Sequence, residues 1–87
     1  MKIRYNTSFS KALRKLDVQK QNSVRETIDR FRKNHNDPRL KNHILIDNLK
    51  GCRAISVDRK LRIIFREFEN YHLVLFIDVG SHDKVYR

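Results

Sequence analysis

Three strand-like segments follow one another closely in the C-terminal half of the chain, and they restrict the possible fold more than any other feature. The segments span about residues 52–58, 61–68 and 71–79, and the turn-like pairs Arg59-Lys60 and Glu69-Asn70 separate them. Turns this short connect strands that run in opposite directions. The sequence therefore predicts an antiparallel three-stranded meander.

An N-terminal strand and two amphipathic helices are expected before this meander. Residues 2–5 alternate polar and apolar side chains, as an edge strand does. Thr7 or Ser8 can cap a first helix and Asp17 a second, and both helices repeat apolar residues at helical spacing. The repeated residues are Phe9, Leu13 and Leu16, then Val24, Ile28 and Phe31. A break at Asn34–Pro38 and a loop reaching Gly51 follow, so the predicted order is β-α-α-β-β-β.

These elements predict the α+β class, with a small twisted antiparallel sheet packed on an N-terminal helical hairpin. A length of 87 residues suits a single domain, spanning residues 1–87. The longest apolar run has five residues, and the N-terminus lacks the pattern of a signal peptide, so we expect a cytoplasmic protein without membrane contact. The single cysteine, Cys52, excludes an internal disulfide, and no zinc motif surrounds it.

Side-chain alternation predicts which residues of the meander face the helices. The more apolar sets are Ile55 and Val57, then Leu61, Ile63 and Phe65, then Leu73, Leu75 and Ile77. Arg62 belongs to the opposite, mixed face, together with the end of the last strand that leads to His82. Arg62 and His82 are therefore expected to converge, although a bulge at Gly80 would change the parity of the last strand.

The balance of charge indicates the class of partner. Twenty Lys and Arg against ten Asp and Glu give a net charge of +10. An apolar fraction of 39% that includes five phenylalanines and three tyrosines is too high for a disordered basic tail, so the charge lies on a folded body. The expected partner is polyanionic: RNA, DNA, the ribosome or an acidic protein.

The end of the last strand carries the side chains with the most chemical potential. His82 can act as a general acid or base near neutral pH, and Tyr86 can orient a substrate or stack on a base. Each candidate also has an ordinary structural explanation. His82 is a common type of surface residue, Arg62 could pair with Asp58 or Glu67, and Tyr86 could pack its ring against the sheet.

Three sequence blocks have the order and spacing of a known family. They are Asn48-Leu49-Lys50-Gly51-Cys52-Arg53-Ala54-Ile55, Val57-Asp58 followed by Leu61-Arg62-Ile63-Ile64-Phe65, and Val79-Gly80-Ser81-His82-Asp83-Lys84-Val85-Tyr86. In these blocks the chain resembles the RelE/ParE superfamily of toxins from type II toxin–antitoxin systems. It looks closest to the RelE/YafQ-like mRNA interferase branch. The resemblance covers essentially the whole chain, and its last block is the most specific.

The resemblance implies a RelE-like fold and an endoribonuclease that cleaves messenger RNA on the ribosome and inhibits translation. It also implies a cognate antitoxin, contact with operator DNA only through the antitoxin complex, and no metal or organic cofactor. By this resemblance His82 takes part in proton transfer, Tyr86 holds the nucleotide and Arg62 binds phosphate. The further residues expected to contact RNA are Arg53, Arg59, Lys60 and Lys84.

The chain also departs from its relatives, some of which carry histidines at positions matching Asp47 and Ser56, or lysines matching Ala54 and Ser56. Asp47 and Asp58 are therefore alternative acid–base candidates. Two other functions stay open: a non-enzymatic inhibitor of DNA gyrase of the ParE kind, and a degenerate member that only binds antitoxin. The histidine and tyrosine at the end of the chain favour the nuclease, because a gyrase inhibitor needs no proton-transfer group.

Overall fold

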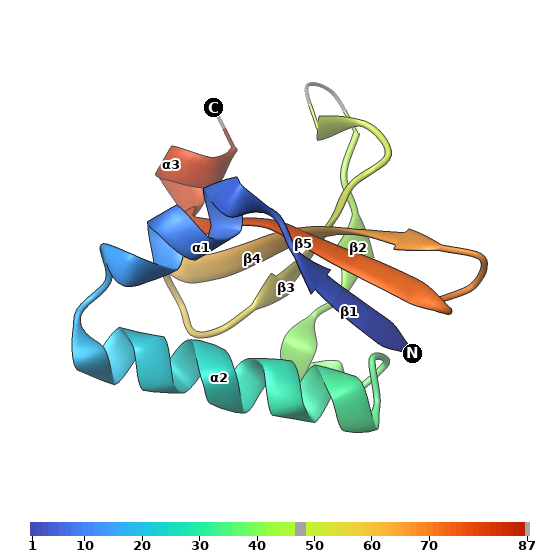
Figure 1. Cartoon of the computed structure of the whole chain (residues 1–87), viewed down its shortest axis with the longest axis horizontal. Coiled ribbons are helices and arrows are strands. Elements are labelled where there is room, and N and C mark those ends of the chain that lie inside the picture. The colour runs from blue at the N-terminus through green and yellow to red at the C-terminus, as the bar shows by residue number, and fades with distance from the viewer. Residues whose placement is uncertain (47–48, 87) are drawn as a thin grey trace.

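The structure is a computed structural model that describes residues 1–46 and 49–86. It contains two N-terminal helices packed on a twisted sheet, which confirms the predicted α+β class (Figure 1). The elements in chain order are β1 (Lys2–Tyr5), α1 (Thr7–Arg14), α2 (Val18–Lys33), the 3-10 helix η1 (Pro38–Leu40), β2 (His43–Ile44), β3 (Arg53–Ser56), β4 (Leu61–Phe68), β5 (Leu73–Ser81) and α3 (His82–Val85).

The sheet has the strand order β1-β5-β4-β3-β2. Strands β3, β4 and β5 form the predicted antiparallel meander. β1 joins its edge in parallel to β5, so the whole sheet is mixed. β2 lies in the segment predicted to be a loop and pairs antiparallel with β3. A strand of two residues is too short for alternation to reveal it in the sequence.

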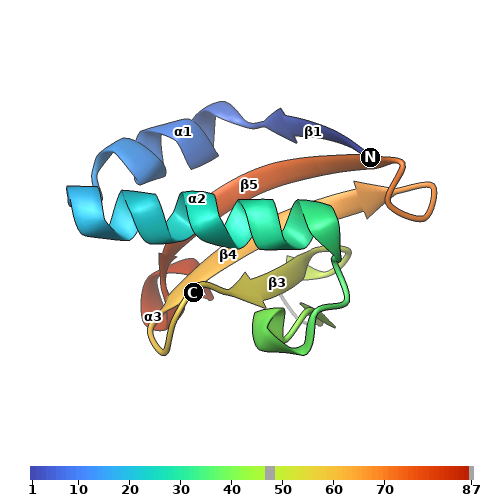
Figure 2. The same cartoon turned by 90° about the horizontal axis from the view of Figure 1, so that it is seen from below.

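The helical hairpin covers one face of the sheet (Figure 2). Asp17 caps α2 as predicted, since its carboxylate accepts a hydrogen bond from the Lys20 backbone N–H at 2.9 Å. The N-cap of α1 is Asn6 rather than Thr7 or Ser8. Among the described residues, no helix is both long enough and apolar enough to cross a membrane.

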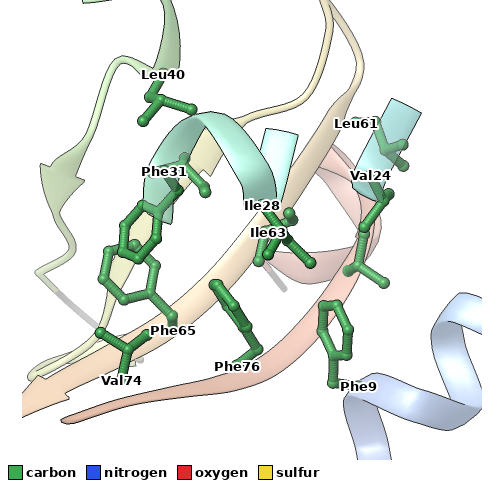
Figure 3. Close-up of a cluster of buried hydrophobic side chains, with 12 residues drawn as sticks. Phe9, Val24, Ile28, Phe31, Leu40, Leu61, Ile63, Phe65, Val74 and Phe76 are labelled. Atoms are coloured by element: carbon green, nitrogen blue, oxygen red, sulfur yellow. The ribbon is translucent and has the colours of Figure 1, made fainter. Parts of the chain in front are cut away.

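The main hydrophobic core lies between the helices and the sheet (Figure 3). Four phenylalanines form its centre, with Phe31 5.0 Å from Phe65 and 5.7 Å from Phe76 between ring centroids. The buried members of this core are Phe9, Val24, Ile28, Phe31, Leu40, Ile55, Leu61, Ile63, Phe65, Val74, Phe76 and Val79.

The predicted parity is correct for β3 and β4 but wrong for most of β5. Val74 and Phe76 are fully buried in the main core, whereas Leu73, Leu75 and Ile77, predicted to face the helices, are only half-buried. The cause is a register shift between β4 and β5: Ile64 pairs with Asp78 while Phe65 pairs with Phe76, which leaves Ile77 as an extra residue. The bulge thus lies at Ile77 and not at Gly80.

The bulge is anchored to the helical layer and restores the predicted faces beyond it. The Ser8 hydroxyl donates a hydrogen bond of 2.5 Å to the carbonyl of Ile77. After the bulge, Val79 returns to the main core, and Gly80 lies opposite Arg62 as the alternation predicts. The bulge therefore changes which side chains of β5 enter the main core, but it leaves the end of the strand with the faces that the sequence predicts.

A second, smaller core covers the opposite face of the sheet, where α3 folds back over β4. Its buried members are Cys52, Ala54, Ile64 and Val85. Cys52 is thus a small buried residue with a free thiol. Half-buried Ile77 and Tyr86 pack against this cluster, so it fixes the C-terminal residues on the face that carries Arg62.

The parity of β5 can be tested by comparing two truncations. Phe76→Ala should lower the free energy of unfolding by about 3 to 5 kcal/mol, because it empties a fully buried site. Leu75→Ala should lower it by less than about 2 kcal/mol, because that side chain is already partly in water. Urea denaturation followed by circular dichroism measures both. A larger loss for Leu75→Ala would contradict the observed register.

Candidate active site

The end of β5 and the adjoining turn hold His82 in place. His82 begins α3, and its backbone N–H donates to the carbonyl of Lys60 at 2.9 Å. Ser81 caps the helix, with its hydroxyl oxygen accepting from the Lys84 N–H at 3.2 Å. Val85, buried in the second core, holds the short helix against the sheet. The position of His82 is thus set by β4, β5 and α3 together.

A close approach of α3 to the sheet requires Gly80. A Cβ atom at this residue would lie 3.2 Å from Cγ1 of Val85 and 3.5 Å from Cδ of Lys84. Gly80 is also the cross-strand neighbour of Arg62. Glycine is therefore suited to this point because it allows the close approach of α3.

Tyr86 lies against His82, with ring centroids 4.4 Å apart and ring planes at 81°. Its hydroxyl oxygen is buried and has no hydrogen-bond partner among the described residues. Burial raises the pKa of this hydroxyl, and the positive charge of Arg62 opposes that shift. The phenol therefore stays protonated at neutral pH.

Arg62 has no carboxylate partner in the described part of the chain. Its guanidinium Nη1 donates to the backbone carbonyls of Asp58 and Leu61 at 2.6 and 3.1 Å. The two acidic residues that the sequence suggested as partners are engaged elsewhere. Asp58 accepts from the backbone N–H groups of Lys60 and Leu61, both at 2.8 Å, and Glu67 accepts from the Tyr71 N–H at 3.0 Å.

Asp83 is the carboxylate beside His82, but the contact is weak. Its Oδ1 lies 3.6 Å from Nδ1 of His82, and the two side chains are 104% and 60% exposed. An ion pair this exposed contributes little to stability. His82 is therefore accessible from solvent, as a residue that exchanges protons with a substrate must be.

Of the two alternative acid–base candidates, Asp47 and Asp58, the structure describes only Asp58. Asp58 organises the β3–β4 turn through the two backbone hydrogen bonds to its Oδ1, so one of its carboxylate oxygens has a structural role. Asp47 lies outside the described residues.

The predicted RNA contacts divide between the two faces of the sheet. Three of them are exposed: Arg59 and Lys60 in the β3–β4 turn, and Lys84 in α3. Lys84 lies two residues after His82 in the sequence, and the carbonyl of Lys60 accepts the hydrogen bond from the His82 backbone N–H. Arg53 lies on the helix side of the sheet, where its Nε donates to Asn42 Oδ1 at 2.9 Å. The sheet thus separates Arg53 from the candidate site.

One basic residue on the site face was not among the candidates. Arg66 alternates with Ile64 and Arg62 along β4, is exposed, and donates to the Lys50 carbonyl at 3.4 Å. Gly51, with φ +88°, allows this approach, since a Cβ there would lie 2.9 Å from Nη2 of Arg66. The alternation of β4 was the signal that could have identified Arg66.

Together, the site can supply three functions to a phosphodiester: proton transfer from His82, charge stabilisation from Arg62, and a neutral donor and ring surface from Tyr86. Ala54 and Ser56, at positions where some relatives have basic residues, lie on the same face. Ala54 is fully buried in the second core, and Ser56 is the β3 neighbour of Arg62. Within residues 1–46 and 49–86, no three His, Cys, Asp or Glu residues are grouped so as to hold a metal ion.

Comparisons with known proteins agree with this fold. A family model described as a bacterial toxin of type II toxin-antitoxin system, YafQ, matches residues 1–87. A search of curated proteins found no significant match.

Several solved structures share this fold at low sequence identity. YafQ from E. coli strain BL21(DE3) is 22% identical with a TM-score of 0.79, over 98% of this chain and 97% of that chain. The E. coli DinJ-YafQ toxin-antitoxin complex contains a chain 22% identical with a TM-score of 0.76, over 98% and 96%. The YoeB/ParE toxin from Agrobacterium tumefaciens is 14% identical with a TM-score of 0.76, over 94% and 99%. These neighbours confirm the RelE-like fold.

The buried hydroxyl of Tyr86 has a consequence for stability at high pH. Its pKa in the folded state is raised above the ordinary value of 10.0, so the unfolded chain loses this proton first. The stability that this difference in pKa contributes is fully present below pH 10.0. It is lost as the pH rises through the folded-state pKa of Tyr86. Tyr86→Phe should therefore lose less stability than wild type in alkaline solution.

At neutral pH, Tyr86→Phe should not destabilise the protein, because the hydroxyl that it removes has no hydrogen-bond partner among residues 1–46 and 49–86. Tyr5→Phe, at an exposed tyrosine, is the matched control and should follow the alkaline loss of wild type. Urea denaturation at several pH values measures these differences. Equal alkaline losses in Tyr86→Phe and Tyr5→Phe would show that Tyr86 is not buried as described.

Proposed function

The chain belongs to the YafQ family of toxins from type II toxin–antitoxin systems, and on that premise we propose that it is an endoribonuclease that cleaves messenger RNA on the ribosome. The observation that carries this proposal is the grouping of Arg62, Tyr86 and His82 on one face of the sheet. The net charge of +10 supports an RNA partner. Cleavage of messages during translation would inhibit protein synthesis.

The proposed reaction is attack of a ribose 2′-hydroxyl on the adjacent phosphorus. The new O2′–P bond forms as the P–O5′ bond breaks, which yields a 2′,3′-cyclic phosphate and a 5′-hydroxyl. The 2′-hydroxyl loses a proton and the departing 5′-oxygen gains one. His82 carries out one of these proton transfers, and none of the steps requires a metal ion or an organic cofactor.

Arg62 stabilises the negative charge that develops on the phosphate oxygens during this reaction. A guanidinium is always charged and can contact two oxygens at once. Because Arg62 is bonded to backbone carbonyls rather than to carboxylates in the described residues, its charge is available to the substrate. Tyr86 contacts the nucleotide through its ring or its protonated hydroxyl. Arg59, Lys60, Lys84 and Arg66 contact phosphates of the bound strand.

A cognate antitoxin is the proposed protein partner. A complex of DinJ with YafQ is among the similar solved structures, and a surface with net charge +10 suits an acidic partner segment. Operator DNA would be contacted only through that complex. Because the proposed substrate is a message on the ribosome, the proposed location is the cytoplasm.

Substitutions at the site test the proposed chemistry. His82→Gln and Arg62→Ala should each lower the rate of cleavage about 10² to 10⁴-fold, the usual loss for an acid–base group or a transition-state charge contact. His72→Gln is the matched control, because this exposed histidine lies in the turn at the opposite end of β5. Its cleavage rate should equal that of wild type. The assay is single-turnover cleavage of a ribosome-bound message, read by primer extension.

Folding and antitoxin binding should be unchanged in all three variants, as measured by circular dichroism and co-purification. A cyclic phosphate on the upstream fragment would support attack by the 2′-hydroxyl. Wild-type rates in His82→Gln and Arg62→Ala would move the chemistry to other residues. No cleavage by the wild-type protein would favour gyrase inhibition or antitoxin binding alone.

A further inference from the structure

A hollow of about 340 Å³ adjoins the candidate site at the end of the sheet where β4 begins and β5 ends. Four lysines line it: Lys15 and Lys20 from the helical hairpin, Lys60 from the β3–β4 turn, and Lys84 from α3. We call this feature the lysine hollow. Figure 2 shows how the fold brings the β3–β4 turn and α3 to the same end of the sheet.

Apolar residues also line the lysine hollow. Ala12 and Leu16 of the helical hairpin, and Leu61 and Val79 of the sheet, line it together with Gly80 and Ser81. Clefts that bind ligands are commonly about 300 to 1,000 Å³ and combine apolar walls with a few polar groups. The volume and the lining are therefore suitable for a sugar–phosphate unit.

Lysines outnumber acidic residues in the lining of the hollow. Within the described residues, no ion pair forms with Lys15, Lys20 or Lys60. Asp58, whose Oδ1 accepts two backbone hydrogen bonds, is the one acidic residue of this lining among those described, against four lysines. Converging ammonium groups repel one another and raise the local concentration of an anion. The ligand that suits the hollow is therefore negatively charged.

The lysine hollow lies next to the candidate site, to which the backbone of two of its residues connects it. The carbonyl of Lys60, a residue of the hollow, accepts the hydrogen bond from the His82 N–H at 2.9 Å. Ser81 lines the hollow and directly precedes His82. A strand with its reacting phosphate between Arg62 and His82 can thus pass over the end of β5 and place a neighbouring phosphate in the hollow.

We propose that the lysine hollow binds a backbone phosphate of the RNA strand next to the phosphate that is cleaved. This inference rests on the proposed ribonuclease function and adds a second anchoring point to it. Lysine is suited to this role because its ammonium is a compact charge on a flexible stem. Contacts to the backbone set the register of the strand without selecting a base. The hollow therefore positions the substrate.

The test measures binding of a labelled 2′-O-methyl oligoribonucleotide, which lacks the hydroxyl needed for cleavage, by fluorescence anisotropy across a range of salt concentrations. Loss of one phosphate contact should make the log–log salt slope shallower by about 0.7, which is about fivefold in affinity near 0.1 M salt. The variant Lys15→Gln/Lys20→Gln should show this change. The matched control, Lys11→Gln/Lys33→Gln, changes two lysines of the same helices outside the hollow and should keep the wild-type slope.

Backbone amide NMR of the wild-type protein gives a second measurement, in which the oligonucleotide should shift the signals of Gly80 and Ser81. The proposal is overturned if the wild type does not bind at low salt, if both double variants lose affinity equally, or if Gly80 and Ser81 do not respond. It is also overturned if the hollow variant binds RNA normally but loses affinity for the antitoxin.

Cleavage by the wild-type protein separates this proposal from the function on which it rests. Message cleavage with normal oligonucleotide binding by Lys15→Gln/Lys20→Gln would keep the ribonuclease and reject the hollow. Binding through the hollow without cleavage of any message would keep an RNA site and reject the ribonuclease.

Discussion

The pairing of β4 with β5 is the interaction on which the rest of the structure depends. These are the two longest strands, and their ladder carries the register shift at Ile77. On the helix side, the shift places Phe76 among the aromatic rings of α1 and α2. On the other side, it returns Gly80 to a position opposite Arg62. One extra residue thus satisfies the packing of the core and the geometry of the candidate site together.

The two faces of the sheet differ in the way they use polar groups. On the helix side, Asn42 accepts a hydrogen bond from Arg53 and donates one to the Tyr71 hydroxyl, which completes the packing beside the core. On the opposite face, Arg62 is bonded only to carbonyls among the described residues, and the Tyr86 hydroxyl is buried without a partner. A buried hydroxyl without a partner costs stability. A functional role is one explanation for a buried polar group left in this state.

The excess of positive charge acts at two ranges. Over the whole surface, a net charge of +10 attracts a polyanion and speeds its encounter with the protein. Close to the sheet, individual cations are the proposed contacts to the RNA strand: Arg62 at the candidate site and the four lysines of the hollow. Phosphate contacts of this kind supply affinity and orientation, whereas in the proposed reaction the proton transfers depend on the accessible ring of His82.

Much of the fold could be predicted from local pattern. Helical spacing identified α1 and α2, alternation and short turns identified the meander, and Asp17 marked the start of α2. These signals depend on neighbours along the chain, which a sequence displays directly. The parallel pairing of β1 with β5 was not predicted, because two strands at opposite ends of a chain give no local sign of being adjacent.

For the site, the sequence by itself determined the chemistry: the residue types at positions 62, 82 and 86, the excess of positive charge, and the placement of Arg62 on the face opposite the helices. Only the tertiary structure decided which side chains meet. It placed Tyr86 against His82, separated Arg53 from them, and brought Lys15, Lys20 and Lys60 to one hollow. The physical reason is that contacts between distant segments depend on strand register and helix packing, and a single bulged residue changes the register without altering the local pattern.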